Sequence, residues 1–363
     1  MIVMALDHVR DFVSHAAQSF APDDLSRTTA ALFFTRWITH FCAPTFALTT
    51  GIGAYLWLGS SRTIGQLSRF LFTRGLWLLF LEVTAMRFAY GFNFTYQPVF
   101  LLVFWSLGCS MIWLSLVARL PLRALAIISV ATILIHNLFD PIRAGALGSW
   151  GWLWHVLHQP GIVAPGGMLV LVAYPLIPWL DVVSAGFCFG WLVKQRRTDM
   201  MIRIGAGMTL AFIALRSLHL YGDPRPWSGG FLSFLNCTKY PPSLEFLLMT
   251  LGPAILVLAW FDRFKFSDRN PLIVFGRVPL FFFVLHFFAI HLTALVLAWL
   301  RYGTPQSLLR PLPTFGGPDF PGYGYSLPVV CLVWAGIVIA FYPLCRWFAS
   351  VKARRTDWWL SYL

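Results

Sequence analysis

The stretch LIVFGRVPLFFFVLHFFAIHLTALVLAWL at residues 272–300 decides the class of fold, because Arg277 is its only permanently charged side chain. A helix needs about 20 predominantly apolar residues to cross a bilayer. The rest of the chain has the same character: 58% of its 363 residues are hydrophobic, 11% are charged, and the mean hydropathy is +0.71. A soluble domain has about 25% charged residues. The composition excludes a water-soluble enzyme, a secreted disulfide scaffold and a disordered regulator, and it indicates an integral membrane protein.

Apolar runs separated by turn and charge signals predict an all-α, polytopic transmembrane helical bundle of about ten spans. No linker is polar enough to divide the chain, so we expect a single domain over residues 1–363. The first span is expected to be truncated at the N-terminus, because only a short apolar run precedes Asp7. The expected spans are Met1–Phe20, Ala30–Leu58, Phe70–Tyr90, Pro98–Val117, Ala124–Phe139, Met168–Val193, Met200–Leu220, Leu244–Phe261, Leu272–Leu300 and Leu327–Phe348.

The net charge of +13 would point to nucleic acid in a soluble protein, but in a membrane protein it is typical of cytoplasmic loops. The connections 62–69, 119–123 and 194–203 supply most of the cationic bias. Both termini are therefore expected in the cytoplasm, with the lipid bilayer and not nucleic acid as partner. The loops on the opposite side are rich in Pro, Gly, Trp and Tyr. They fit either an aromatic belt or a ring-lined cleft for a sugar-like substrate.

The most unusual polar cluster is Asp7-His8-Val9-Arg10-Asp11, since ionisable groups within spans are expensive and are functional candidates by default. His8 and Asp11 are three residues apart and share a helical face. Arg10 can neutralise Asp7 or Asp11. The cluster fits either a charged helix end that meets water or a histidine tuned by a carboxylate as a general base.

A second cluster lies at Arg36 and His40, which are four residues apart and so share a face of the next span. Because the first two spans are consecutive and antiparallel, His8 and His40 are expected at comparable depth. Two histidines and two arginines converging there predict a site.

Further candidates are scattered along the chain. His286 and His291 lie in one span, five residues apart, so they cannot face the same ligand, and His286 lies nearer the membrane centre. A buried ion pair between Arg74 and Glu82 is a further hypothesis. His155 and His158 have no other ligand cluster near them in the sequence, so no metal site is expected. The remaining candidates are basic residues at span ends, Arg216, His219 and Lys239.

Several motifs together resemble the bacterial DUF1624 proteins of the heparan-α-glucosaminide N-acetyltransferase catalytic-domain family, within the transmembrane acyltransferases. The resemblance is carried by His286 and by residues 6–12 (LDHVRDF), 36–44 (RWITHFCAP), 239–244 (KYPPSL), 270–280 (NPLIVFGRVPL) and 358–363 (WWLSYL). His8 stands where related O-acyltransferases of surface polysaccharides have a histidine, and His40 occupies a position that is Asp in the glucosaminide enzyme. His286 resembles the late-helix histidine of that enzyme.

The resemblance implies transfer of an acetyl or other short acyl group from cytosolic acyl-CoA to a carbohydrate or cell-envelope acceptor across the bacterial inner membrane. A homodimer remains open. A transporter with an intramembrane His/Arg/Glu site and a non-catalytic membrane protein are the alternatives. The expected catalytic residues are His40, His8, Asp11, Arg36 and His286, with a histidine as general base or acyl carrier. Topology predicts Arg69, Arg74 and Arg277 for the CoA phosphates. The expected substrate-binding residues are Asp7, Arg10, Arg216, His219 and Lys239.

Overall fold

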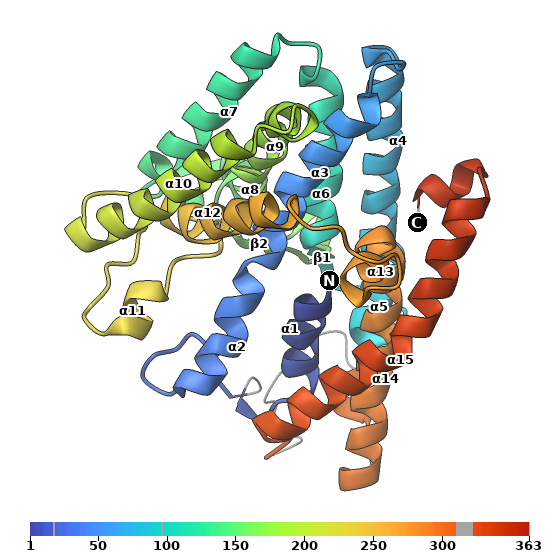
Figure 1. Ribbon diagram of the computed structural model, residues 1–363. Helices are drawn as coiled ribbons and strands as arrows, with labels where there is room; N and C mark the ends of the chain where they lie inside the picture. Colours follow the sequence, from blue (N-terminus) through green and yellow to red (C-terminus); the bar gives the residue numbers. More distant parts are fainter. Residues whose placement is uncertain (17–18, 96, 310–321, 363) are drawn as a thin grey trace. The chain divides into compact units, whose positions relative to one another are not determined.

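The structure is a computed structural model that describes residues 1–363 except 17–18, 96, 310–321 and 363. It is mostly helical (Figure 1), and the chain forms two compact units. Unit 1 comprises Met1–Cys42, Thr84–Pro98 and Lys265–Leu363, and unit 2 comprises Ala43–Val83 and Val99–Phe264. The single domain expected over the whole chain stays a prediction.

Unit 1 is built around α1, which packs against α2, α14 and α15. Its other packing contacts join α14 to α15 and to α5, and α13 to α15 and to α14. The helices of unit 1 are α1 (Ile2–Val13), α2 (Ala30–His40), α5 (Arg87–Gly91), α13 (Pro271–Arg277), α14 (Pro279–Tyr302) and α15 (Leu327–Arg354), with short 3-10 turns at Gln306–Leu309 and Trp358–Tyr362.

Unit 2 contains two long helix pairs, α4 with α6 and α10 with α12, and α9 packs on both α6 and α7. Its α-helices are α3 (Cys42–Leu58), α4 (Ile64–Leu81), α6 (Val103–Val117), α7 (Leu122–Ile135), α8 (Gly151–Leu157), α9 (Trp179–Lys194), α10 (Thr198–Leu218), α11 (Phe231–Leu235) and α12 (Leu244–Phe261). A π-helical turn, Glu82–Met86, follows α4, and 3-10 turns lie at His136–Phe139, Ala144–Trp150 and Pro165–Gly167.

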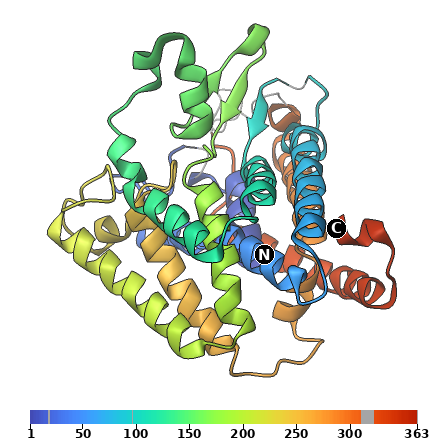
Figure 2. The ribbon, with the colours of Figure 1, turned by 90° about the horizontal axis from the view of Figure 1, so that it is seen from above.

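A small sheet in the order β1-β3-β2 belongs to unit 2. Strand β3 (Val170–Val172) pairs in parallel with β1 (Val99–Leu101) and antiparallel with β2 (Gly161–Val163). The hairpin of β2 and β3 projects from the unit's long helices (Figure 2). Strands this short leave the sheet as an appendage to a helical unit.

Among the residues that the structure describes, six helical segments are long and apolar enough to cross a membrane, which indicates an integral membrane protein. The expected count of about ten spans is not confirmed. The six segments are Ala30–Leu58, Leu122–Phe139, Thr198–Leu218, Leu244–Phe261, Pro279–Tyr302 and Leu327–Arg354.

The expected span Leu244–Phe261 coincides with α12, whereas others are interrupted. Within Ala30–Leu58, α2 ends at His40, because Pro44 has no N–H to donate to the His40 carbonyl. A second proline, Pro279, begins α14 and divides the expected span Leu272–Leu300.

Two other expected helices were wrong in part. The span Met168–Val193 contains a strand and a loop before α9 begins at Trp179, since Pro175 and Pro178 interrupt the run. The span Phe70–Tyr90 begins earlier, at Ile64, where Thr63 and Gln66 form a capping box. Its α-helix ends at Leu81.

An ionic cluster joins α1 to α2. The Asp7 carboxylate accepts from the Arg10 guanidinium, from Arg36 Nη1 at 2.9 and 3.0 Å to its two oxygens, and from Thr39 Oγ1 at 2.8 Å. Arg10 is fully buried and also donates to Asp11 at 3.0 Å. The sequence allowed Arg10 to neutralise either aspartate, and it contacts both.

Close helix crossings in unit 2 depend on glycine. A Cβ built on Gly51 of α3 would lie 2.0 Å from the Val183 carbonyl oxygen of α9, and one on Gly186 would lie 2.2 Å from the Leu48 carbonyl oxygen. Backbone groups cannot rotate away as a flexible side chain can. These two glycines therefore set how closely α3 and α9 approach, as small residues do between membrane helices.

Gly51→Ala should lower the free energy of unfolding by about 1–3 kcal/mol or more, because the added methyl meets backbone. Gly53→Ala on the same helix is the matched control, since nothing lies within 4 Å of a Cβ there, and it should be neutral or stabilising by about 0.5–1 kcal/mol. Unfolding in mixed micelles measures both. Equal effects of the two substitutions would contradict the close-crossing interpretation.

Asp7→Asn should destabilise unit 1 by about 3–5 kcal/mol, because it leaves the buried Arg10 without its main counter-charge. Asp11→Asn removes a carboxylate from the same arginine, but Asp11 is 40% exposed where Asp7 is 14%, so its effect should be below about 1 kcal/mol. Both are measured by unfolding in mixed micelles at constant pH. A larger effect from Asp11→Asn would overturn the ranking.

Candidate active site

Two histidines from distant parts of the sequence meet in unit 1. His8 lies on α1 and His286 on α14, and their ring centroids are 5.5 Å apart. The His8 ring also packs edge-on against Phe287 at 4.8 Å and Phe283 at 5.9 Å. The two imidazoles therefore touch within an aromatic surrounding, and both were among the residues expected to be catalytic.

The hydrogen bonding of His286 fixes which nitrogen carries its proton. Its Nδ1 lies 2.7 Å from the Phe282 carbonyl oxygen one turn earlier. A carbonyl can only accept, so Nδ1 is the donor and Nε2 holds the lone pair. The ring is fully buried, and Nε2 has no hydrogen-bond partner among the described residues. His286 thus presents an oriented neutral base with a vacant acceptor site.

His291, one and a half turns further along α14, is held differently. Its Nδ1 lies 2.6 Å from the Ala89 carbonyl oxygen, and its Nε2 lies 3.0 Å from that of Leu308. Both nitrogens are occupied by backbone, which favours a structural role. The functional role expected for His286 stays a prediction.

The ionic cluster described above lies on the same helix as His8. Asp7 immediately precedes His8, and Arg36 and Thr39 reach Asp7 from α2. His40, the last residue of α2, is buried and is one helical turn from Arg36. Catalytic roles for His40, Asp11 and Arg36, and substrate contact by Asp7 and Arg10, stay predictions.

The arginines expected to bind CoA lie in both units. In unit 2, Arg69 is exposed on α4, and the Arg74 guanidinium lies 5.1 Å from the Phe70 ring centroid. In unit 1, Arg277 is about half exposed and pairs with Asp268 at 2.5 Å. Their accessible cationic groups suit phosphates, and their joint role stays a prediction.

Glu82, the expected partner of Arg74, has a clear structural function. Its carboxylate oxygens accept the backbone N–H groups of Leu102 at 2.8 Å and Phe104 at 3.0 Å. Those amides belong to the beginning of α6, where N–H groups have no partner inside the helix. Glu82 therefore connects the end of α4 to the beginning of α6.

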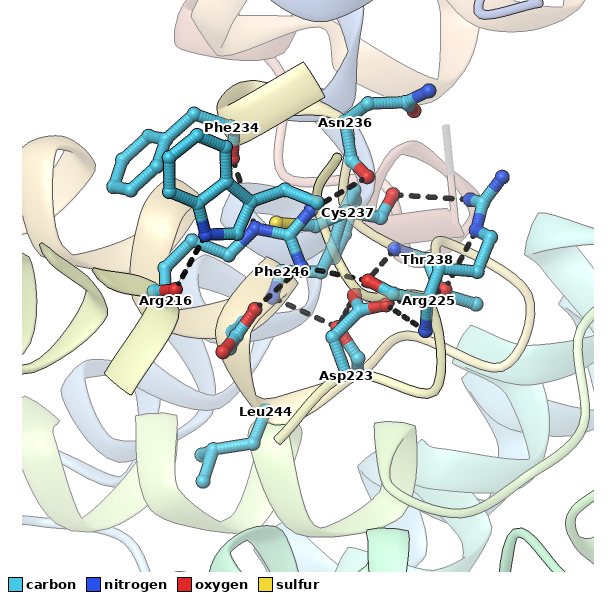
Figure 3. Close-up of polar contacts among 12 residues, drawn as sticks. Arg216, Asp223, Arg225, Phe234, Asn236, Cys237, Thr238, Leu244 and Phe246 are labelled. Carbon is cyan, nitrogen blue, oxygen red and sulfur yellow. Dashed lines mark hydrogen bonds and ion pairs between the residues drawn. The ribbon is translucent and has the colours of Figure 1, made fainter. Parts of the chain in front are cut away.

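Arg216, on α10, organises the loop that connects α10 to α12 (Figure 3). It forms a buried ion pair with Glu245 at 2.9 Å. Its other donors reach the backbone oxygens of Phe234, Arg225, Ser233 and Asn236 at 2.9–3.2 Å. All five guanidinium N–H groups are thereby used, so the geometry favours a loop-organising role for Arg216. His219, also expected to bind substrate, is exposed and stacks on Trp227.

A second hub in this loop, Asp223, was missed by the sequence analysis. Its carboxylate accepts from the Thr238 and Arg225 backbone amides at 2.7 and 2.8 Å, and from the Thr238 and Ser243 hydroxyls at 2.9 and 2.7 Å (Figure 3). The Asp-Pro pair at 223–224 is a turn signal that could have identified it. Asp223 therefore holds both ends of the segment 238–243.

One potential metal-ligand group occurs at this place, among the described residues. Ligand atoms of Asp223, Cys237 and Glu245 lie within 4.8 Å of one another. Burial raises the pKa of the Cys237 thiol, with Asp223 adding to the shift, so the sulfur is protonated. Glu245 already pairs with Arg216, and a guanidinium beside the group repels a cation. These residues do not fit a metal.

A histidine network at the far end of α7 was also missed. His158 Nε2 lies 2.9 Å from an Asp140 oxygen, and Asn137 Nδ2 donates to the other at 2.7 Å. Burial raises the pKa of Asp140, but the His158 and Asn137 hydrogen bonds outweigh it and lower the pKa overall. His136 Nε2 lies 2.9 Å from the Pro242 carbonyl oxygen. The HxxH spacing of His155 and His158 therefore reflects an anchor for neighbouring loops.

The comparisons with known proteins identify a family for the chain. The family model for heparan-alpha-glucosaminide N-acetyltransferase, catalytic, matches residues 13–222, more than half of the chain. No curated protein and no solved structure matches the chain. The family indicates membrane acetyltransferase activity, in keeping with the apolar helices. The chain belongs to the heparan-alpha-glucosaminide N-acetyltransferase catalytic family.

Proposed function

We propose that the protein is a transmembrane acyltransferase that moves an acetyl or other short acyl group from cytosolic acyl-CoA to a carbohydrate or envelope acceptor. The observation that carries the proposal is the buried pair of His8 and His286, with Nε2 of His286 available as a base. Membership of the acetyltransferase family supports the reaction class. The cationic connections support cytoplasmic termini, and the proposal places the protein in a bacterial inner membrane.

The proposed step is a direct transfer. His286 Nε2 takes the proton from the hydroxyl or amine of the acceptor, while the oxygen or nitrogen lone pair of the acceptor attacks the thioester carbonyl carbon. An O–C or N–C bond forms, the C–S bond breaks, and the leaving CoA thiolate takes the proton back from the imidazolium. The Phe282 carbonyl stabilises the imidazolium through Nδ1–H. General base catalysis of this kind contributes about 10²–10⁴-fold.

His8 would serve as a second proton-carrying group beside the base. Its ring touches that of His286, and its neighbour Asp7 ties α1 to α2 through Arg36. The ionic cluster thus orients the helix that carries His8. Arg36 and Asp11 act in this proposal by positioning, and His40 remains the alternative base.

The reaction is tested by mass spectrometry of envelope glycans from deletion and overexpressing cells. We expect the glycans of the two strains to differ in mass by one acyl group. We also expect purified protein in proteoliposomes to transfer label from acetyl-CoA to glycans of the deletion strain and so restore the missing mass. Uptake of a labelled solute without any acyl donor would favour a transporter instead. No acyl difference in cells and no label transfer in vitro would refute the enzyme.

His286→Ala should lower acyl transfer per folded protein by about 10²–10⁴-fold, because it removes the Nε2 lone pair that the proposal assigns as the general base. His291→Gln on the same helix is the matched control, and its rate should stay within about twofold although its stability falls. Label transfer and thermal unfolding are measured for both. Added imidazole should partly restore the alanine variant. Undiminished transfer by His286→Ala and loss in His40→Ala would reassign the base.

Acetyl-CoA should raise the melting temperature of the purified protein, since binding to the folded state alone stabilises it. Arg69→Gln, Arg74→Gln and Arg277→Gln should each weaken the apparent affinity by about tenfold if the side chain meets a phosphate. Arg119→Gln, at another cation-rich turn, is the control and should bind normally. If acetyl-CoA raises the melting temperature of all four variants equally, the three arginines do not bind CoA.

A further inference from the structure

A cavity of about 610 Å³ lies at one end of unit 1, and the proposed reaction does not use it. It forms just beyond the end of α1, where the last turn of α14 and the beginning of α15 come together. None of the described residues that line it is acidic, and they include an arginine and a histidine. A cavity whose charges have one sign attracts ligands of the opposite sign, so this one suits an anion.

Backbone contacts fix the side of the cavity where α1 and α15 meet. The His15 amide donates to the Tyr325 carbonyl oxygen at 3.0 Å, and the Tyr325 amide donates to the Val13 carbonyl oxygen at 2.8 Å. Gly324 has a φ of +104°, and a Cβ there would lie 2.4 Å from the His15 nitrogen. Glycine permits this approach. The segment before α15 is therefore held against the end of α1 before any ligand arrives, which lowers the entropic cost of binding.

Arg301, in the last turn of α14, supplies the permanent positive charge of the cavity. Its Nη1 donates to the Gly324 carbonyl oxygen at 2.8 Å, and its guanidinium carbon lies 4.9 Å from the centroid of the Tyr325 ring. Unlike Arg216, which pairs with Glu245, it has no carboxylate partner in the part of the chain that the structure describes. Because Arg301 is exposed, water meets its remaining donors, and a ligand oxygen can replace that water.

Two further donors line the same cavity. The His15 ring makes no hydrogen bond to a described residue, and an imidazole has an N–H to donate in either protonation state. Ser326 is the N-cap residue of α15, but its hydroxyl does not cap that helix. A guanidinium, an imidazole and a hydroxyl around one space are donors that suit the oxygens of a phosphate.

Apolar side chains continue from the cavity along both helices. Val329 lines the cavity, and Leu332, three residues later and therefore on the same face of α15, is 71% exposed. Leu300, next to Arg301 on α14, is 70% exposed. A polar cavity with exposed apolar helix surface beside it matches an amphiphilic ligand, which has a charged head and a hydrocarbon chain. An inorganic phosphate would leave the apolar surface unused.

The position of the cavity in the bilayer favours a lipid as that ligand. The ends of membrane-spanning helices lie near the level of the lipid headgroups, and arginines at such ends extend toward that level. At the opposite end of α15, Lys352 and Arg354 are typical of a cytoplasmic boundary. With that end in the cytoplasm, the cavity lies at the non-cytoplasmic interface.

We propose that this cavity binds the headgroup of an anionic phospholipid. Arg301, His15 and the Ser326 hydroxyl donate to the phosphate oxygens, and an acyl chain lies along α15 past Val329 and Leu332. The planar guanidinium matches two phosphate oxygens at once, and basic pockets between membrane helices bind anionic headgroups. A described lining with a permanent positive charge and no acidic residue favours an anionic headgroup over a zwitterionic one, whose ammonium it would repel.

The test is thermal unfolding of the full-length protein in neutral detergent micelles. The probes are phosphatidylglycerol, phosphatidylcholine with the same chains, diacylglycerol, glycerophosphate and inorganic phosphate. Phosphatidylglycerol should raise the melting temperature at a concentration about tenfold below that at which phosphatidylcholine does. At the same concentrations the other three probes should leave it unchanged, because each lacks either the phosphate or the chains. Native mass spectrometry should find one phosphatidylglycerol retained per chain.

Arg301→Gln should weaken the phosphatidylglycerol response by about tenfold and remove the retained lipid, because the charge that meets the phosphate is lost. Arg301→Lys should keep part of the response, and His15→Gln should weaken it by about threefold. Arg143→Gln is the matched control, since Arg143 is an exposed arginine after α7 that does not line this cavity. It should respond like the unchanged protein. The melting temperature of each variant without lipid reports whether it folds.

Equal stabilisation by phosphatidylglycerol and phosphatidylcholine would overturn the proposal. So would equal responses of Arg301→Gln and Arg143→Gln, because a general attraction of anionic lipid to a basic protein would then explain the binding. Stabilisation by inorganic phosphate that depends on Arg301 would assign the cavity to a free phosphate instead. If Arg301→Gln does not fold, an undiminished response of both Arg301→Lys and His15→Gln overturns the proposal. Neither histidine of the candidate active site lines the cavity, so the inference does not depend on acyl transfer.

Discussion

The buried Arg216 guanidinium is the constraint on which the loop architecture of unit 2 depends. A cation between two apolar helices is stabilised by acceptors for its donors, since each unmatched donor at that depth costs free energy. Glu245 supplies one acceptor, and the other four are backbone oxygens of a loop that has little secondary structure of its own. The loop therefore follows the path that brings those oxygens to the arginine.

The same constraint acts in unit 1 with a different result. Arg10 is fully buried and depends on Asp7, which in turn collects Arg36 and Thr39 from α2. The charges of this cluster hold the two helices together, but Nε and Nη1 of Arg10, like Nε2 of His286, have no hydrogen-bond partner among the described residues. A buried group without a partner calls for a physical explanation, and in the proposed function the acceptor is the partner of His286 Nε2.

The sequence predicts much of the fold and only part of the site. Hydropathy placed α12 correctly, because the apolar run 244–261 is continuous and the helix accommodates Pro253 within it. Hydropathy wrongly predicted a helix over 168–178, because a short apolar run that contains valines has the same pattern in a buried strand as in a buried helix. His8 and His286 were each singled out by their cost in an apolar segment, but their contact depends on the packing of α1 on α14. Asp223 escaped notice because its importance lies in partners that the fold brings to it.

Arg216 at the end of α10 and Lys239 in the loop before α12 differ in how many partners the chain gives them. Arg216 offers five donors in a planar fork and satisfies all of them within the chain, which makes it suited to holding a loop and unsuited to exchanging ligands. Lys239 offers one compact charge that its own loop leaves without a counter-ion.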